Sequence, residues 1–434
     1  MNNRYSKTER YLGKFLDASP KIRSFLKYSY LKLNYFLYKE ARFEFALHPD
    51  VLLQDVSQVE LKNKSSNPLG HEFFGYYDKS PWSKDMKDML VHQWDGGAGI
   101  SVVLYSLCIE SQVVGHTEAW NFQQGAMAQW CPQNSPGKIV FNAISHQNLV
   151  SVWVDSRGNS QEIPWPVQVV HPQGHKALTL NYRRLDRLRP DYGYKIPVQN
   201  FSPNQPLDKD GIWEIDLEKG HAELIISLSQ LTNHQPRPEM ADAEHKVNHI
   251  LYSPLGNRFV FMHRWLGKAG KFSRLYVTNS HQFSPQLLLD HRMVSHYSWE
   301  DEDHLLVWAR HPWEGDRYYR INVITGNLEV IGKDILDVLG DGHPSFSPDR
   351  RWIITDSYPD RRRQRHLLLF DRHNNCVFCV GRFFAPWRFD GEKRTDLHPR
   401  WSHDGQNISI DSSHTGIRRS YILDISNLIN QEFL

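Results

Sequence analysis

Four histidines occupy one position of a segment that repeats through the second half of the 434-residue chain. His249, His296, His343 and His398, called the register histidines below, each stand four residues before a position that is serine in three of the four repeats. Neutral imidazoles bind transition metals such as manganese, iron, nickel or zinc. Histidine also titrates near neutral pH and therefore serves as a general acid or base. A structural ring, with each imidazole hydrogen-bonded to backbone, is the alternative interpretation.

Charged residues accompany the register histidines. Asp341 and Asp396 each precede a register histidine by two residues, and we expect them either to orient an imidazole or to cap a turn. Arg264 and Arg400 carry guanidinium groups that suit the carboxylate of a bound substrate. An ordinary surface role is the alternative for both arginines.

Aromatic residues lie directly before the first repeat, in the stretch 71–78. His71, Tyr76 and Tyr77 could stack on sugar rings or donate a proton. Core packing of at least one tyrosine is the competing interpretation, because aromatic side chains dominate protein cores. These three residues are therefore candidates for contact with a substrate.

The repeat itself predicts the fold. Each unit contains an aromatic or apolar residue, a Ser-Pro or similar pair, a turn residue and a short strand, and Pro with Asp or Gly favours a tight turn. Successive units begin 48, 40, 82, 47, 47 and 55 residues apart, which is near the length of a four-stranded propeller blade. The first residues of the units are Trp82, Trp130, Val170, Tyr252, Trp299, Phe346 and Trp401.

Seven units predict an all-β, seven-bladed β-propeller over residues 51–434, with an insertion at about 181–210 that explains the longest step. Six and eight blades stay open as alternatives. A pair of β-sandwiches does not explain a turn that recurs at a near-constant step, and few helical patterns lie between the strands for a βαβ array. Equivalent positions of neighbouring blades are related by rotation, so the register histidines should converge at one end of the central channel.

Residues 1–50 differ from the rest of the chain and are predicted to form a short, basic, helical segment. The first 48 residues contain ten Lys or Arg and four Asp or Glu. Aromatic residues and leucines interleave with lysines between Phe25 and Tyr38. A helix of this kind either makes a peripheral contact with an anionic membrane surface or packs against the flank of the propeller.

The whole chain has a formal net charge of only +2, which argues against nucleic acid as a partner. Its N-terminus lacks the apolar segment of a secretory signal, and no stretch is apolar enough to span a bilayer. Four cysteines are too few for a disulfide framework. The sequence therefore predicts a cytoplasmic location, peripheral to the inner face of the membrane if the N-terminal segment binds lipid.

The histidine-bearing segments resemble the oligogalacturonate lyase family and its TolB-like propeller relatives, over roughly residues 245–425. The resemblance implies a seven-bladed propeller that cleaves uronate-containing oligosaccharides by β-elimination. It also implies a divalent metal, typically manganese, held by histidines and a glutamine. The matching segments are 249–254, 263–265, 295–299, 342–349 and 396–401.

Specific roles follow from this resemblance. His343 and His398 correspond to metal ligands, and His249 to an additional ligand. His296 corresponds to the base that abstracts a proton. The sequence departs from the family near His398, where no convincing glutamine ligand is found.

The implied chemistry also assigns roles to the other candidates. The metal or Arg264 would stabilise the charge that develops on the uronate carboxylate. Water, Tyr76 or Tyr77 would protonate the leaving oxygen, while His71, Tyr76 and Arg400 would bind the substrate. The sequence therefore predicts a carbon–oxygen lyase that acts on a uronate-containing oligo- or polysaccharide. The alternative is a non-catalytic TolB-like propeller that binds a protein or glycan partner.

Overall fold

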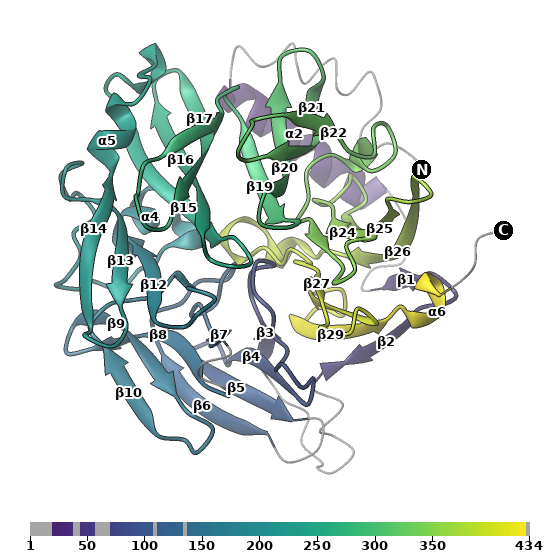
Figure 1. The fold of residues 1–434 in the computed structure, drawn as a ribbon. Coiled ribbons are helices and arrows are strands. Elements are labelled where there is room, and N and C mark those ends of the chain that lie inside the picture. Colours follow the sequence, from purple (N-terminus) through teal and green to yellow (C-terminus); the bar gives the residue numbers. More distant parts are fainter. Residues whose placement is uncertain (1–19, 38–43, 57–69, 107–110, 133–136, 431–434) are drawn as a thin grey trace.

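The computed structural model describes residues 20–37, 44–56, 70–106, 111–132 and 137–430. In these ranges the chain forms seven sheets arranged around a central axis (Figure 1). The sheets follow one another around the ring in chain order, and each begins with its innermost strand except for two that add an outermost strand from the N-terminal part of the chain. This architecture confirms the predicted seven-bladed β-propeller.

The first three blades contain no register histidine, and each has four strands. From the channel outward, blade by blade, they are β3 (His71–Phe73), β4 (Asp88–Trp94), β5 (Ile100–Ser106) and β6 (Gln112–Thr117); β7 (Gln129–Trp130), β8 (Ile139–Ser145), β9 (Asn148–Val154) and β10 (Ser160–Ile163); and β11 (Val169–Val170), β12 (Lys176–Leu180), β13 (Gly211–Asp216) and β14 (His221–Ser227).

The last four blades contain the register histidines. In two of them the outermost strand comes from the N-terminal part of the chain. From the channel outward they are β15 (Glu244–Tyr252), β16 (Arg258–Gly267), β17 (Gly270–Asn279) and β18 (Gln286–Leu289); β19 (Val294–Trp299), β20 (His304–His311), β21 (Gly315–Asn322) and β22 (Leu328–Val330); β23 (Ser345–Phe346), β24 (Trp352–Asp356), β25 (Gln364–Asp371), β26 (Cys376–Phe384) and β1 (Phe45–Leu47); and β27 (Arg400–Trp401), β28 (Asn407–Ser412), β29 (Arg419–Asp424) and β2 (Leu52–Asp55).

The N-terminal strands close the ring. In the seventh blade β2 pairs antiparallel with β29, with Leu52 opposite Asp424. In the sixth blade β1 adds a fifth strand beside β26, with Phe45 opposite Phe383. The first and last blades are also joined directly, because the Glu72 N–H donates to the carbonyl of Arg418 at 2.9 Å. Both ends of the chain therefore contribute to one closed architecture, which leaves only short strand edges.

The repeated turn between the first and second strands has a common hydrogen-bond scheme. In four blades a serine Oγ accepts the backbone N–H that begins the second strand, and the residue three positions after the serine has a φ between 62° and 81°. Glycine adopts this conformation without a Cβ clash, which explains Gly256 and Gly405 at that position. The hydrogen-bonded pairs are Ser83 with Asp88, Ser253 with Arg258, Ser347 with Trp352, and Ser402 with Asn407.

The hydrophobic core lies between adjacent blades. Between the fifth and sixth blades, for example, Leu306 and Trp308 belong to one buried cluster with Ile353 and Phe370. Burying one such side chain stabilises the fold by about 2 kcal/mol. A single four-stranded sheet cannot bury both of its faces, so the ring of blades supplies the missing partner.

The predicted insertion folds back onto one end of the channel. It contains α4 (Tyr182–Leu188) and the 3-10 turn η2 (Pro190–Tyr192). Asn181 caps α4 by accepting two backbone N–H groups with its side chain. The rings of Tyr182 and Tyr194 stack at 4.3 Å between centroids and are fully buried. The insertion is therefore an ordered part of the propeller.

The N-terminal helix α2 (Pro20–Leu37) confirms the predicted helical segment, and it lies behind the fifth and sixth blades in the view of Figure 1. Its Tyr28 and Tyr35 contact Trp387 through ring edges, at 5.8 and 6.0 Å between centroids. No helix in the described ranges is long and apolar enough to cross a membrane. The remaining helices and turns are α5 (Leu228–Asn233), α6 (Ser426–Ile429), η3 (Pro238–Met240), η4 (Asp337–Leu339), η5 (Trp387–Phe389) and η6 (Gly391–Lys393).

Candidate functional site

The register histidines form one continuous row at the end of the channel. The ring centroids of His249 and His296 are 6.4 Å apart, those of His296 and His343 4.1 Å, and those of His343 and His398 4.4 Å. Each side chain lies in, or just before, the innermost strand of its blade, and all four residues are buried. Rotational equivalence thus brings the imidazoles together, as the repeat register predicts.

Hydrogen bonds fix the tautomers of His343 and His398. The Nδ1 of His343 lies 2.7 Å from the Asp356 carboxylate, and the Nδ1 of His398 lies 2.8 Å from the Gly75 carbonyl. Both partners accept hydrogen bonds, so Nδ1 carries a proton in each ring, and in that tautomer Nε2 keeps its lone pair. Both Nε2 atoms are buried and have no hydrogen-bond partner among the described residues. They are two adjacent, unsatisfied electron-pair donors.

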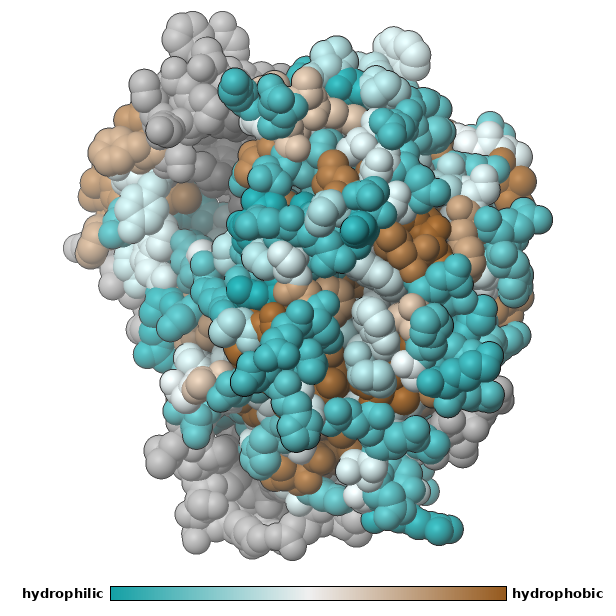
Figure 2. Space-filling view, turned by 90° about the vertical axis from the view of Figure 1, so that its left-hand side faces the viewer, coloured by the Kyte–Doolittle hydropathy of each residue, from teal (hydrophilic) through white to brown (hydrophobic). Residues whose placement is uncertain are grey.

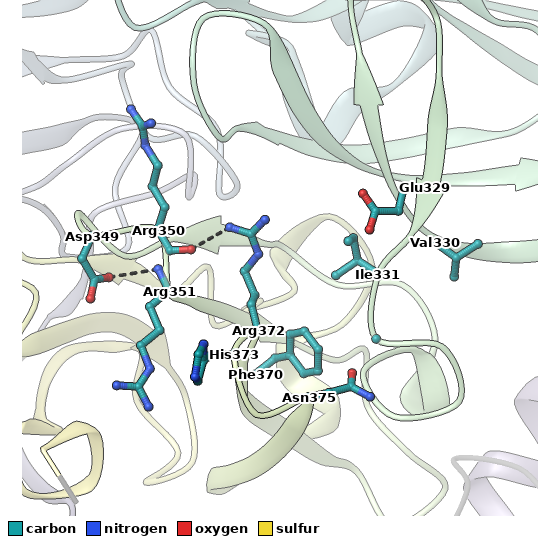
Figure 3. A pocket seen from close by; sticks show the side chains of 11 residues that line it. Glu329, Val330, Ile331, Asp349, Arg350, Arg351, Phe370, Arg372, His373 and Asn375 are labelled. Carbon is teal, nitrogen blue, oxygen red and sulfur yellow. Dashed lines mark hydrogen bonds between the residues drawn. The ribbon is translucent and has the colours of Figure 1, made fainter. Parts of the chain in front are cut away.

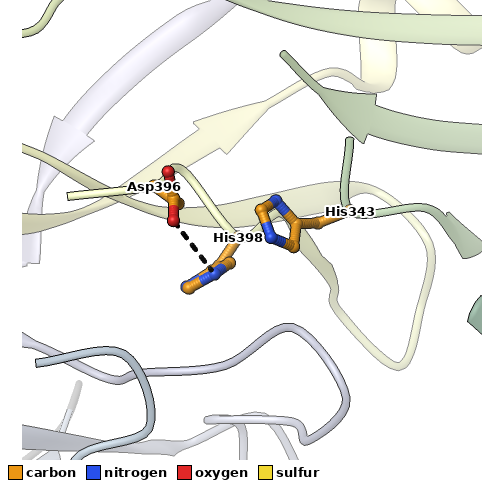
Figure 4. A group of neighbouring side chains, drawn as sticks. All are labelled: His343, Asp396 and His398. Carbon is orange, nitrogen blue, oxygen red and sulfur yellow. Dashed lines mark ion pairs between the residues drawn. The ribbon is translucent and has the colours of Figure 1, made fainter. Parts of the chain in front are cut away.

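Asp396 completes a candidate metal centre with these two histidines (Figure 4). One ligand atom from each of His343, Asp396 and His398 lies within 4.8 Å of the others. The carboxylate also pairs with Arg365 at 2.6 Å and with Arg394 at 2.8 Å. Although burial opposes ionisation, these two guanidinium groups hold the pKa of Asp396 well below its usual range. Each carboxylate oxygen has a second lone pair, so the ion pairs leave room for a metal bond.

The predicted additional ligand, His249, lies outside this three-residue set. Its ring stacks on that of Tyr76 at 5.0 Å, and its Nε2 is 3.5 Å from the Tyr76 hydroxyl. Burial and the nearby Arg264 lower the pKa of His249 well below its usual value. The structure therefore places a neutral imidazole beside a tyrosine here, and Asp396 takes the third position of the candidate metal centre.

His296 has the surroundings of a general base. Its Nδ1 lies 2.9 Å from the Asp341 carboxylate, which leaves the lone pair on Nε2. Burial lowers the pKa of His296, while Asp341 opposes this effect. The Ser295 hydroxyl donates to the same carboxylate at 2.6 Å and fixes its orientation. A neutral, oriented imidazole of this kind can accept a proton at neutral pH.

The two candidate tyrosines differ in whether the hydroxyl proton is available for transfer. The Tyr77 hydroxyl donates to the Tyr297 carbonyl and accepts the Tyr297 N–H, both at 2.9 Å, so its proton is committed to backbone. The Tyr76 ring contacts His398 at 4.8 Å and His343 at 5.8 Å. Burial raises the pKa of Tyr76 well above its usual value, which keeps its hydroxyl protonated. Tyr76 is therefore the better proton donor of the pair.

Unpaired cations adjoin the histidines. Arg264 makes its hydrogen bonds to the Met262 sulfur and has no acidic partner among the described residues. Lys246 is buried, and its Nζ contacts only the Leu188 carbonyl, at 3.4 Å, within the part of the chain that the structure describes. Burial and the neighbouring Arg264 lower the pKa of Lys246 to about 7. Positive charge without a counterion in a buried site favours an anionic ligand.

The insertion supplies residues that the sequence analysis missed. Tyr192 meets His249 edge to face at 5.2 Å, and its hydroxyl accepts a hydrogen bond from Arg394 at 3.2 Å. Arg394 also pairs with Asp191, so the insertion and the connection before β27 meet above the histidines. Arg189 belongs to the same group, because its charge lowers the pKa of His249 and of Lys246.

Arg400 differs from its predicted role. It is 2% exposed, and its guanidinium donates to the carbonyls of Gly75 and Tyr76 and to the Asp411 carboxylate. Arg400 therefore holds the backbone that leads to Tyr76, where a contact with substrate was expected.

His71 lies apart from the register histidines. Among the described residues, its ring contacts are with Trp94 at 5.3 Å and Phe389 at 5.5 Å. It lines an open pocket of about 860 Å³ beside the first blade. Burial, followed by the charges of Arg388 and Arg418, lowers the pKa of His71 to about 4. A contact between His71 and substrate stays a prediction, and it would be made at this separate pocket.

A recurring polar residue on the second strand positions the site, and the sequence analysis did not single it out. Asp356 accepts the backbone N–H groups of His343, Leu397 and His398 at 2.9 to 3.2 Å, in addition to the His343 ring. The equivalent residue joins other blades to the next innermost segment. These equivalents are His92, which accepts from Ala126, Asn142, which bonds Val167, and Asp411, which accepts from Phe74 and Gly75.

A second open pocket, of about 800 Å³, is lined by residues of the fifth and sixth blades (Figure 3). No register histidine lines it. Three arginines do, but Arg351 is paired with Asp371 at 2.7 Å and Arg372 with Glu300 at 2.9 Å. The histidine row therefore offers more chemistry than either open pocket.

Comparison with known proteins identifies the fold. No protein-family model and no curated protein matches the sequence. An oligogalacturonate lyase from Vibrio parahaemolyticus matches the structure with a TM-score of 0.60 and 13% sequence identity, over 88% of this chain and 97% of the other. An oligogalacturonate lyase in complex with manganese gives a TM-score of 0.59 and 14% identity, over 88% and 96%. The chain is therefore a seven-bladed β-propeller whose structural neighbours include the oligogalacturonate lyases.

Proposed function

We propose that this protein is a carbohydrate-active lyase that cleaves a uronate-containing oligo- or polysaccharide by β-elimination, assisted by a divalent metal. One observation carries the proposal: the buried Nε2 atoms of His343 and His398 have no hydrogen-bond partner among the described residues, and both histidines lie beside the Asp396 carboxylate. Buried polar atoms without a partner cost free energy. A metal ion would satisfy both lone pairs at once.

The residues present fit a divalent metal. His343, His398 and Asp396 would hold it, and this nitrogen and oxygen donor set suits manganese as well as zinc or iron. The manganese complex of a structural neighbour supports manganese as the first choice. When bound, the metal would act as a Lewis acid that neutralises charge on the substrate carboxylate.

The remaining residues account for the proton transfers. The Nε2 of His296 takes the proton from C5 of the uronate, the C5–H electron pair forms the C4=C5 double bond, and the C4–O4 bond breaks. The protonated hydroxyl of Tyr76 then supplies a proton to the leaving oxygen. Arg264 is available to bind a uronate carboxylate, and Lys246 adds a second positive charge when it is protonated.

The test is an assay of the purified full-length protein on oligomers of galacturonate, glucuronate and mannuronate. After treatment with a chelator, the protein is assayed with and without added Mn²⁺. We expect ultraviolet absorbance from a 4,5-unsaturated product only when Mn²⁺ is present. If Mn²⁺ binds and no substrate yields this product, the lyase proposal is wrong.

Non-catalytic binding is the second candidate function, and the burial of the site favours it. The register histidines are between 0% and 7% exposed, so a long glycan chain has little direct access to them. In that case the protein would bind a uronate glycan or a protein without altering it. Binding of the same oligomers, measured by calorimetry and unaccompanied by product, would select this function.

A further inference from the structure

Helix α2 is attached to the propeller by one face. Tyr28 and Tyr35 contact Trp387, and the Tyr35 ring also stacks on Phe384 at 6.1 Å. Asn34, on the same side of the helix, is 8% exposed. These contacts fix which face of α2 points inward.

The opposite face of α2 is hydrophobic. Seven of the fifteen exposed large hydrophobic residues in the described ranges belong to this one helix. At 3.6 residues per turn, five of the seven lie along one stripe on the side of the helix opposite Asn34 and Tyr35. The stripe, called the outer stripe below, consists of Phe25 (69% exposed), Leu26 (45%), Leu33 (56%), Phe36 (70%) and Leu37 (67%).

Such an arrangement is unusual for a helix on a water-facing surface, where polar residues normally point outward. The flank of the propeller shown in Figure 2 is mainly hydrophilic, with hydrophobic residues protruding at its left margin, the rear of Figure 1, where α2 lies. A contiguous exposed apolar patch marks an interaction site. Among the described residues, the ring contacts of α2 with the propeller are made by Tyr28 and Tyr35, which lie outside the outer stripe.

The charge of the surrounding segment identifies the partner. The first 48 residues carry ten Lys or Arg against four acidic residues, while the whole chain has a net charge of only +2. Lys32 lies 4.7 Å from the Tyr28 ring centroid, beside the outer stripe. A helix that combines an apolar face with flanking cations lies in the plane of an anionic lipid surface.

We propose that α2 docks this protein onto the surface of an anionic lipid bilayer, with the outer stripe inserted among the acyl chains and headgroups. The helix would lie on the bilayer, because it is not apolar enough to span it. Phe384 ends β26, and Trp387 lies near the start of the connection from β26 to β27. That connection carries Asp396, so docking would place the bilayer beside the segment that leads into the candidate metal centre.

The experiment is vesicle co-sedimentation of the full-length protein. One set of vesicles contains phosphatidylcholine and phosphatidylglycerol in equal amounts, and the other contains phosphatidylcholine alone. We expect binding to the anionic vesicles, weakening as salt is raised. The double variant Phe25→Ser/Phe36→Ser should bind at least about tenfold more weakly. The matched control is Trp313→Ser, which removes a residue that is 86% exposed outside α2 and should bind like wild type.

Three results would overturn the proposal. These are no binding of the wild type to either vesicle, equal binding to both vesicles, and unchanged binding of the double variant. Sedimentation velocity without vesicles tests the remaining occupant, a second copy of the chain. A dimer that the double variant abolishes would assign the outer stripe to self-association instead of lipid.

Discussion

The first three blades and the last four share a backbone but use the register position differently. In the first three blades this position holds Lys79, Met127 and Val167. Met127 and Val167 are 2% and 1% exposed and belong to hydrophobic clusters, while Lys79 pairs with Asp78 at 2.9 Å. In the last four blades the same position holds the register histidines. The ring geometry thus supplies a channel-facing position in every blade. The residue type decides whether that position packs in the hydrophobic core or contributes to the candidate site.

The backbone conformation at the register position does not distinguish the first three blades from the last four. Three register residues adopt a left-handed φ: Met127 at 57°, His249 at 53° and His398 at 46°. A strained residue is often taken as a sign of function. In this propeller the same strain occurs at Met127, a core residue in the three blades without register histidines, so it reflects the entry into the innermost strand.

The largest effect is expected from substitutions that remove a candidate metal ligand from the last four blades. His343→Ala and His398→Ala each delete one of the unsatisfied Nε2 donors, so we expect Mn²⁺ affinity to fall at least about 100-fold. Calorimetric titration of the chelator-treated protein measures this. Met127→Ala, at the same register in the second blade, is the control. It should bind Mn²⁺ normally while losing about 2 to 5 kcal/mol of unfolding free energy. Normal Mn²⁺ binding by both histidine variants would show that the register position binds no metal in the last four blades either.

The next substitutions distinguish the candidate base, His296, from the candidate metal ligands within the last four blades. His296→Gln removes the proton acceptor but no member of the candidate metal centre, so kcat should fall about 10²- to 10⁴-fold with Mn²⁺ binding retained. Asp341→Asn removes only the carboxylate that orients this ring, and about a tenfold to hundredfold loss is expected. Steady-state kinetics on the active oligomer measure both. An Asp341→Asn loss equal to that of His296→Gln would mean that the carboxylate acts by more than orientation.

A third comparison uses the polar residue of the second strand. Asp356→Asn should lower Mn²⁺ affinity about tenfold to hundredfold, because Asp356 orients His343 and the backbone of His398. Asn142 holds Val167 in the same way in the other half. Asn142→Ala should therefore cost about 1 to 3 kcal/mol of unfolding free energy and leave Mn²⁺ binding unchanged. Equal changes in Mn²⁺ affinity for both variants would show that the stability of the propeller, and not the local positioning of the histidines, determines Mn²⁺ affinity.

Sequence alone predicts what is local and periodic. The turn pattern recurs near one spacing, so the seven blades and the convergence of the register histidines are both accessible from it. The structure differs at His249, which is turned to the ring of Tyr76, and at Arg400, which is engaged by Gly75 and Asp411. Those outcomes depend on contacts between blades that are distant in sequence.

The residues that sequence analysis missed have two origins. Tyr192 and Arg189 come from the insertion, which has no equivalent in other repeats, and the partner of Tyr192, Arg394, lies 202 positions away. No local pattern contains such a pair. Asp356 is different, because a polar residue also occurs at the equivalent second-strand position in other blades, Asn142 among them. That signal was present in the sequence, as a polar residue at the same second-strand position of several blades.

The smallest expected effect compares two histidines outside the channel, in the sixth and seventh blades. His366 lies 3.3 Å from Asp360 and hydrogen-bonds Cys379, and although burial opposes protonation, these partners raise its pKa to about 9. A raised pKa in the folded state stabilises the fold fully below the unfolded value of 6.5. This stabilisation is lost as pH rises toward 9. His414 is the opposite case, because burial lowers its pKa to about 4.

Urea unfolding of His366→Gln and His414→Gln across this pH range tests both signs. The free energy of unfolding of wild type should exceed that of His366→Gln by on the order of 2 kcal/mol at low pH. This difference should shrink between pH 6.5 and about 9. Relative to His414→Gln, wild type should instead lose stability as pH falls from 6.5 toward about 4, because only the unfolded chain binds the proton. Parallel pH profiles for the two variants would mean that local environment does not set the charge of these histidines. Burial also lowers the pKa of His249, His296 and His398, so the His414 profile tests the same physical argument away from the candidate metal centre.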